Sequence, residues 1–254
     1  MTKTIERIAP FAFGLAALGF WQGLVWALGV PSYVLPGPIA IIAAYLNDHA
    51  ALDSALLSTL SVTVAALLGA TIIGVALAVA MAASRLFRAA IQPWAVILQV
   101  TPVVAIAPFI IIWVNQPFLA LVVCAVIVAF FPILSSTAAG LAATPPELQD
   151  LFRLNGATRW QTLTLLSLPS ALPSFLTGLR VSGTLALVGA VVAEFVAGSG
   201  GFASGLAYRI IEASYRLEIP RMFAALVLLG LSGIVIYTAL GWLEAVLLRR
   251  RDGA

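Results

Sequence analysis

Residues 144–169, TPPELQDLFRLNGATRWQTLTLLSLP, form a polar interruption in a chain that is otherwise almost entirely apolar. Thr144 is followed by two prolines and Glu147, a pattern typical of a capping box, so a helix is expected to begin there. Asn155–Gly156 predicts that this helix ends in a left-handed turn. The helix is expected to be amphipathic, with an apolar stripe formed by Leu148, Leu151, Phe152 and Leu154.

The second half of this stretch predicts another short helix. Thr158 is expected to cap it, and it should run over residues 159–167 and end at Pro169. The acids Glu147 and Asp150 on the first helix disfavour binding to anionic lipid headgroups, so a groove on another protein is the expected partner of the loop.

The composition of the whole chain indicates an integral membrane protein. Hydrophobic residues make up 62% and charged residues only 9%, and the mean hydropathy is +1.10. A soluble protein has about 25% charged residues. The basic residues form no broad face, which argues against nucleic-acid binding, and the run Arg249–Arg251 has the character of a topology signal. The single cysteine, Cys124, excludes an intrachain disulfide.

The apolar runs predict an all-α protein with six transmembrane helices in one domain, residues 1–254. A membrane helix needs about 20 apolar residues. The expected spans cover approximately residues 10–30, 56–83, 90–113, 118–139, 173–197 and 222–247. Pro38 is expected to open a brief helix that ends near Asn47, outside the membrane. The mixed segment 198–221 is expected to be external as well.

The distribution of basic residues predicts the orientation. Arg209, Arg216 and Arg221 fall on one side of the predicted membrane. The larger basic group falls on the other side: Lys3, Arg7, Arg85, Arg88, Arg153, Arg159 and Arg249–Arg251. Because the more basic side is cytoplasmic, both termini and the loop 144–169 are expected in the cytoplasm.

Two predicted spans carry small residues at every fourth position, which favours close helix packing. One face consists of Ala66, Ala70, Gly74, Ala78 and Ala82, and the other of Gly178, Ser182, Ala186 and Ala190. The second face continues to Glu194. An intramembrane carboxylate is a candidate functional group. The alternative is that Glu194 lies near the outer interface, hydrogen-bonded to backbone or to an arginine.

The third predicted span contains Pro102 and Pro108, each of which removes a backbone donor. The span is either a bent helix that lines a cavity or a merely kinked packing helix. Spans three to five offer few charges to a pathway; their polar candidates include Thr101 and Ser182. A weakly held solute, with selectivity residing in a separate binding protein, would suit such walls.

The loop motif resembles that of a known family. Its spacing runs from Asp150 through Gly156 to Leu166 and Leu168–Pro169, and Pro173, Gly178–Arg180 and Glu194 follow. It is similar to the cytoplasmic loop of the membrane subunits of bacterial binding-protein-dependent ABC importers, which reads Glu-Ala-Ala, three residues, Gly, nine residues, Ile, one residue, Leu-Pro. Further pieces resemble the branch that imports nitrate, sulfonates, taurine, bicarbonate and vitamin precursors: Leu35–Pro38, Pro93, Thr101–Pro102, Pro108 and Phe131–Pro132. Here Asp150-Leu151-Phe152 stands in place of Glu-Ala-Ala.

The resemblance implies a type I importer permease in the bacterial inner membrane, with a coupling helix between spans four and five. It implies cytoplasmic ABC ATPases, a second permease subunit that we expect to be an identical copy, and a periplasmic or lipoprotein substrate-binding protein. The residues expected to dock on the ATPase are Glu147, Leu148, Asp150, Leu151, Phe152, Arg153 and Gly156. The only lysine is Lys3 and the phosphate-binding loop is absent, so the chain is expected to bind no cofactor and to leave ATP hydrolysis to its partner.

Two rival classes remain open to the sequence. An ion-coupled secondary transporter would use Glu194 as its ion site. An intramembrane enzyme would need a catalytic group of residues, whereas His49 and Cys124 are single and far apart in the sequence.

Overall fold

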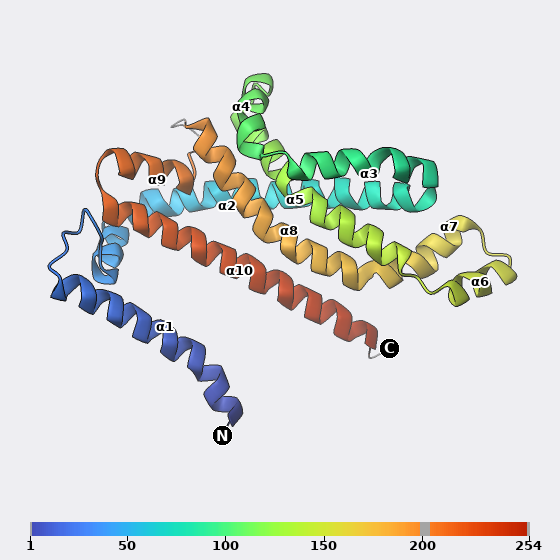
Figure 1. Ribbon diagram of the computed structural model, residues 1–254, viewed down its shortest axis with the longest axis horizontal. Coiled ribbons are helices and arrows are strands. Elements are labelled where there is room, and N and C mark those ends of the chain that lie inside the picture. The colour runs from blue at the N-terminus through green and yellow to red at the C-terminus, as the bar shows by residue number, and fades with distance from the viewer. Residues whose placement is uncertain (1, 199–203, 253–254) are drawn as a thin grey trace.

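The computed structural model describes residues 2–198 and 204–252, and within these ranges the chain is helical with no strand (Figure 1). The helices are α1 (Thr2–Ala27), α2 (Pro38–Ala83), α3 (Arg85–Val100), α4 (Val103–Trp113), α5 (Pro117–Ala142), α6 (Pro146–Leu154), α7 (Arg159–Thr162), the π-helical turn η1 (Leu163–Ser167), α8 (Leu168–Ala197), α9 (Leu206–Tyr215) and α10 (Ile219–Asp252).

The core lies where α2, α5 and α8 meet, and small residues let their backbones approach closely. A Cβ atom on Gly74 of α2 would lie 2.9 Å from Ile133 Cγ2 of α5. A Cβ atom on Gly178 of α8 would lie 2.8 Å from the carbonyl oxygen of Pro132. Both predicted small-residue faces are confirmed as packing faces, except that Ala82, at the end of α2, is exposed.

The six predicted spans are confirmed when the bent pair α3–α4 is counted as one. Five further helices or helical runs are long and apolar enough to cross a membrane: those over 9–27, 38–83, 117–142, 159–197 and 219–249. Helices α3 and α4 meet at an angle of 101° around Thr101–Pro102. The brief helix predicted from Pro38 forms the first part of α2. Asp48, whose dihedral angles are non-helical, separates it from the longer part that follows.

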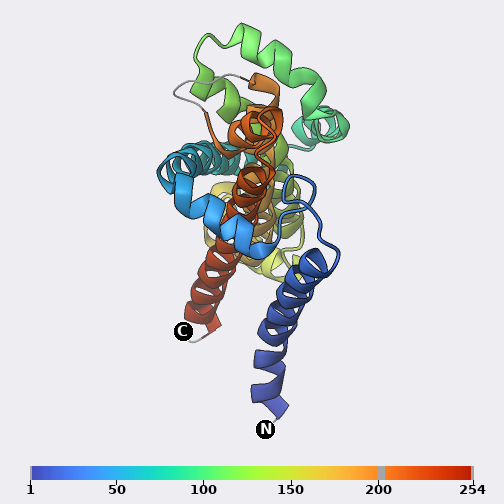
Figure 2. The ribbon, with the colours of Figure 1, turned by 90° about the vertical axis from the view of Figure 1, so that its left-hand side faces the viewer.

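Helix α1 stands apart from the bundle in both ribbon views (Figures 1 and 2). Its contacts gather near its end: Gln22 Oε1 accepts a hydrogen bond from the Ile39 amide, and the rings of Trp21 and Phe223 lie 6.3 Å apart. Large apolar side chains on the rest of α1, such as Phe13 and Phe20, are exposed. This surface is available to lipid or to another subunit.

Two local predictions in the loop were wrong. Thr144 does not cap α6, because its hydroxyl donates to the Leu141 carbonyl at the end of α5, and α6 begins after Pro145 without a side-chain cap. Pro169 does not end the second helix either. The wide π turn η1 precedes it and the helical path continues into α8, where Pro169 occupies the first turn and its missing N–H is tolerated.

The predicted external segment 198–221 contains α9, which packs on α10, α2 and α8. Residues 199–203 of that segment lie outside the described residues. Figure 1 shows α9 and the α6–α7 pair at opposite ends of α8. Both chain termini lie at the same end in Figure 2, and their cytoplasmic location stays a prediction.

Candidate functional site

The loop after α5 ends its first helix with the turn that the sequence predicts. Gly156 has φ = +73°, in the left-handed region that favours glycine. Its amide donates to the Arg153 carbonyl at 3.0 Å, and the Ala157 amide donates to the Phe152 carbonyl at 3.0 Å. This pair of bonds is a Schellman motif, which satisfies the last carbonyls of α6 and reverses the chain.

Helix α6 lies on the surface of the chain. None of its residues is buried, and Leu148 and Leu151 expose 42% and 52% of their surface. Asp150 and Arg153 form an exposed ion pair at 3.5 Å. Of the two bulky residues at positions 151 and 152, Leu151 faces outward and Phe152 is half-buried. An amphipathic helix with its apolar side uncovered can seat in a groove on a partner.

The α6 loop is joined directly to a long helix. Thr158 and Gln161 form a capping box at the start of α7, as the Thr158 hydroxyl accepts from the Gln161 amide and Gln161 Oε1 accepts from the Thr158 amide. From Arg159 the helical path continues through η1 into α8 without a break. Four residues, 155–158, therefore separate α6 from the helical path that leads into α8.

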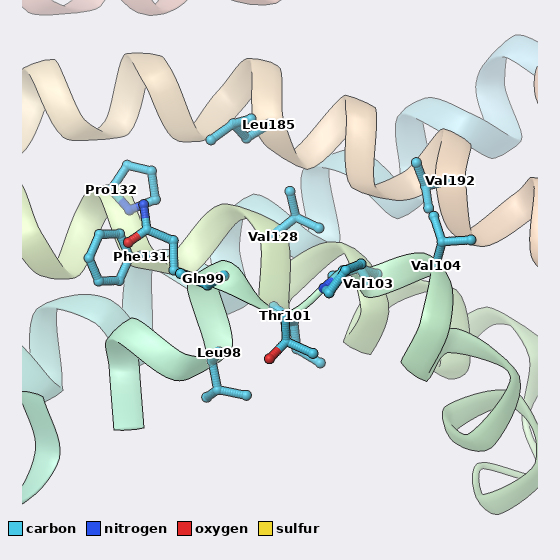
Figure 3. Close-up of a pocket in the computed structure, with 13 residues that line it drawn as sticks. Leu98, Gln99, Thr101, Val103, Val104, Val128, Phe131, Pro132, Leu185 and Val192 are labelled. Atoms are coloured by element: carbon cyan, nitrogen blue, oxygen red, sulfur yellow. The ribbon is translucent and has the colours of Figure 1, made fainter. Parts of the chain in front are cut away.

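A cavity of about 410 Å³ lies where α3, α4, α5 and α8 face one another (Figure 3). Its walls are apolar apart from Gln99 and Thr101, and carry no charged side chain. The Thr101 hydroxyl already donates to the Ile97 carbonyl. The other wall residues are Leu98, Val100, Pro102, Val103, Val104, Ile127, Val128, Phe131, Pro132, Leu185 and Val192.

Only some of the predicted pathway residues lie at the cavity. Thr101 and Pro102 form the bend beside the cavity, which favours the bent, cavity-lining interpretation of the third span. Pro108 is exposed within α4, and Ser182 is fully buried in the packing face of α8, and neither lines the cavity.

Glu194 lies at the far end of α8 and is buried, with 2% of its surface exposed. Its carboxylate accepts hydrogen bonds from the Thr59 hydroxyl at 2.8 Å and from the Ala207 amide at 3.0 Å. The structure agrees with the predicted hydrogen bond to backbone and adds Thr59 as a partner, and both the position of Glu194 near the outer interface and its functional role stay predictions.

An ion-pair network holds the other end of α9, and the sequence did not predict it. Glu212 lies 2.9 Å from both Arg209 and Arg216. Arg221 lies 2.6 Å from Asp48 at the kink of α2 and 2.9 Å from Glu218. The hydrogen bond from Arg209 is the main cause that lowers the pKa of Glu212 below its ordinary value, against the effect of burial. The only feature of the sequence that could have predicted this network is the presence of opposite charges in two segments expected outside the membrane, at Asp48 and in residues 209–221.

Among the described residues no group of three or more His, Cys, Asp or Glu side chains could hold a metal ion. Cys124 is buried in α5 and His49 is exposed on α2.

Comparisons with a family model, with curated proteins and with solved structures all match transport proteins. Residues 70–253 match the family model described as "Binding-protein-dependent transport system inner membrane component". The chain is 32% identical to the formylaminopyrimidine transport permease protein ThiX of Halalkalibacterium halodurans, with 98% of each chain covered. It is 36% identical to the riboflavin transport system permease protein RibX of Chloroflexus aurantiacus, covering 97% of this chain and 93% of that one. The fold is similar to a chain of the MetNI methionine ABC transporter, solved in inward-facing conformations, with a TM-score of 0.65, 22% identity, and 77% of this chain and 95% of that one covered.

Proposed function

The chain belongs to the family of inner-membrane components of binding-protein-dependent transport systems, and from this membership we propose a division of tasks between its two ends. It is a multi-pass permease subunit of an ATP-driven importer. Family membership implies ATPase and binding-protein partners. The lack of a phosphate-binding loop supports the assignment of ATP hydrolysis to the partner and the absence of a bound cofactor on this chain.

The α6 end docks on the ATPase. The observation that carries this proposal is that α6 is amphipathic, has no buried residue and is joined by the short turn at Gly156 to the helical path that runs through α7 and η1 into α8. Its docking surface comprises Glu147, Leu148, Asp150, Leu151, Phe152, Arg153 and the turn at Gly156. Phe152 is half-buried within the chain and Leu151 is exposed, so Leu151 is the bulky residue for which the ATPase groove must have room.

The turn at Gly156 tests this docking. Gly156→Pro should uncouple ATP hydrolysis from uptake, because proline cannot adopt φ = +73° and lacks the amide that bonds to Arg153. Gly156→Asn is the matched control, since asparagine tolerates the left-handed region, and it should keep most coupling. The measurement is uptake per ATP hydrolysed in proteoliposomes. Normal coupling in Gly156→Pro would refute α6 as the point where energy enters.

The proposed orientation places both termini and α6 in the cytoplasm. The support is the excess of basic residues on that side of the predicted membrane. A cysteine placed at the exposed Asn155, in a chain with Cys124 replaced, should react with a membrane-impermeant thiol reagent only in inverted vesicles. Reaction in right-side-out vesicles would contradict the proposed orientation and place α6 on the outer side.

The cavity beside Thr101–Pro102 forms part of the translocation pathway, completed by a second permease subunit that is an identical copy. Large apolar side chains stay exposed on α3 and α4 next to the cavity, including Trp94, Ile97 and Val104. Such a surface fits a second subunit. Cross-linking of a variant whose single cysteine is at position 97 should trap a dimer of this chain. If the variant cross-links only to a different permease, the importer contains a heterodimer and the proposed homodimer is wrong.

The solute is an uncharged, flat vitamin precursor. The uncharged walls of the cavity support this class over an anion such as a sulfonate, and the names of the formylaminopyrimidine and riboflavin permeases agree with it. Exchanging binding proteins on the same permease is the test. Uptake should follow the binding protein among neutral heterocycles and stay low for sulfonates; efficient sulfonate uptake would contradict the proposed class.

A further inference from the structure

The carboxylate of Glu194 joins three helices that are far apart in the sequence. Glu194 belongs to α8, Thr59 to α2 and Ala207 to α9. The Thr59 hydroxyl also accepts a hydrogen bond from the Leu206 amide at 2.9 Å. The four groups are buried, so each hydrogen bond acts without competition from water.

These bonds complete the start of α9. The first amides of a helix have no partner within the helix, and Gly205 at the N-cap has no side chain to supply one. Glu194 therefore serves as a cap from another helix, because its carboxyl group accepts the bond from the Ala207 amide in the first turn of α9.

Gly205 makes this contact sterically specific. A Cβ atom at position 205 would overlap the carboxyl group of Glu194. The close approach of the two residues leaves no room for a side chain, and α9 cannot slide past the end of α8 without breaking the bonds described above.

Helix α8 connects this junction to the α6 loop. Its 30 residues correspond to about 45 Å at 1.5 Å per residue. Figure 1 shows it extending from α7 to the neighbourhood of α9. At its far end α9 is tied to α2 and α10 by Arg221, which pairs with Asp48 and with Glu212.

We propose that Glu194 is a positioning residue that fastens α9 to α8, so that α9 follows the movement of α8 when the ATPases act on α6. This inference rests on the proposed docking of α6. If α8 moved independently, the buried groups at this junction would lose their hydrogen-bond partners, which is costly away from water. Movement of α9 together with α8 avoids that cost.

The test uses the whole importer, with ATPase and binding protein, in lipid nanodiscs and proteoliposomes. Glu194→Gln keeps the size of the side chain and one acceptor oxygen but replaces the other oxygen with an NH2 group, which cannot accept a hydrogen bond. It should leave assembly and basal ATP hydrolysis unchanged, raise hydrogen exchange at the α9 amides 206–207 about ten-fold, and lower uptake per ATP by a similar factor.

Thr59→Val provides a second variant that does not depend on how well Gln is tolerated. It removes the hydroxyl that bridges Glu194 and Leu206, and it should reduce uptake per ATP as Glu194→Gln does. Thr63→Val is the matched control, because Thr63 is equally buried one turn along α2 but bonds only to the carbonyl of Thr59 in its own helix. It should transport within about two-fold of the parent chain.

Hydrogen exchange at α6 separates the two proposals. Protection of the α6 amides on ATPase binding supports the proposed docking, and its absence refutes docking without reference to Glu194. If α6 is protected while Glu194→Gln and Thr59→Val keep normal uptake per ATP, Glu194 has only a structural role and the inference is overturned. The inference is likewise overturned if the variants raise hydrogen exchange of the α9 amides but leave uptake per ATP unchanged.

Discussion

Helices α6 and α9 connect neighbouring spans at opposite ends of α8, and both end in the same turn. In α6 the amides of Gly156 and Ala157 bond to Arg153 and Phe152. In α9 the amides of Leu217 and Glu218 bond to Ser214 and Ala213 in the same pattern. The left-handed residue differs, however: Gly156 has φ = +73°, whereas Leu217 has φ = +57° and carries a side chain.

The surroundings of the two helices account for this difference. No residue of α6 is buried, so its turn is held by local bonds alone and uses the residue that adopts positive φ at little cost. Helix α9 has four buried residues and is held by Glu194 at one end and by Arg221 at the other. The contacts of α9 with its neighbours offset the cost of a positive φ at Leu217. Helix α6 has no buried residue whose packing could offset such a cost.

Gly205→Ala should have the largest effect on stability, because the new Cβ atom overlaps the Glu194 carboxyl group. Overpacking of this kind costs about 1–3 kcal/mol. Gly156→Ala strains the local turn at φ = +73° but should leave the global midpoint unchanged, because α6 does not contribute to the core. Thermal reaction of a thiol dye with Cys124, the single and fully buried cysteine, measures both. Equal midpoints for the two variants would contradict the contrast between the ends.

Low pH should loosen the α9 end. The hydrogen bond from Arg209 lowers the pKa of Glu212, so the unfolded chain takes up this proton before the folded chain does. The stabilisation by Glu212 is therefore complete above its ordinary pKa of 4.5 and is lost as the pH falls through the lower folded value. Circular dichroism melting should show a smaller loss of stability from pH 6 down to about pH 3 in Glu212→Gln than in the parent chain. Glu147→Gln on α6 is the control and should follow the parent.

The sequence predicts the spans and packing faces well because both follow from regular spacing. Gly74 and Gly178 lie at fixed intervals on their helices, and the faces they mark are those that meet α5. The left-handed end at Gly156 was equally predictable, since Asn-Gly after an amphipathic run specifies it locally.

The contacts of Glu194 and Thr144 could not be predicted, because they depend on partners that only the fold supplies. Thr59 precedes Glu194 by 135 positions, and nothing in the sequence connects them. The Thr144 hydroxyl had the expected pattern of a cap, but the Leu141 carbonyl at the end of α5 offered it a different acceptor. The 101° bend at Thr101–Pro102 was foreseeable as a bend but not in size, which depends on packing against α5 and α8.

Leu217→Gly should stabilise the α9 end modestly, by about 1 kcal/mol, because glycine adopts φ = +57° without the clash that a side chain causes. Leu217 exposes 74% of its surface, so little packing is lost within the chain. The reverse change on α6, Gly156→Leu, should weaken its turn by a similar amount, visible as faster hydrogen exchange of the α6 amides. A loss of stability in Leu217→Gly would mean that Leu217 packs against another part of the assembled importer.

Asp150→Ala should have the smallest effect on the stability of the chain, and it isolates docking from folding. The pair with Arg153 is 3.5 Å long and highly exposed, and such surface pairs contribute about 0–1 kcal/mol. The dye midpoint should therefore not move. Uptake should nevertheless fall, since Asp150 stands at the acidic position of the docking motif and its exposed carboxylate can exchange Arg153 for a basic group on the ATPase. Asp150→Glu, which restores the usual acid of the motif, should recover uptake. If Asp150→Ala transports normally, the apolar residues Leu148 and Leu151 hold α6 in its groove without help from charge.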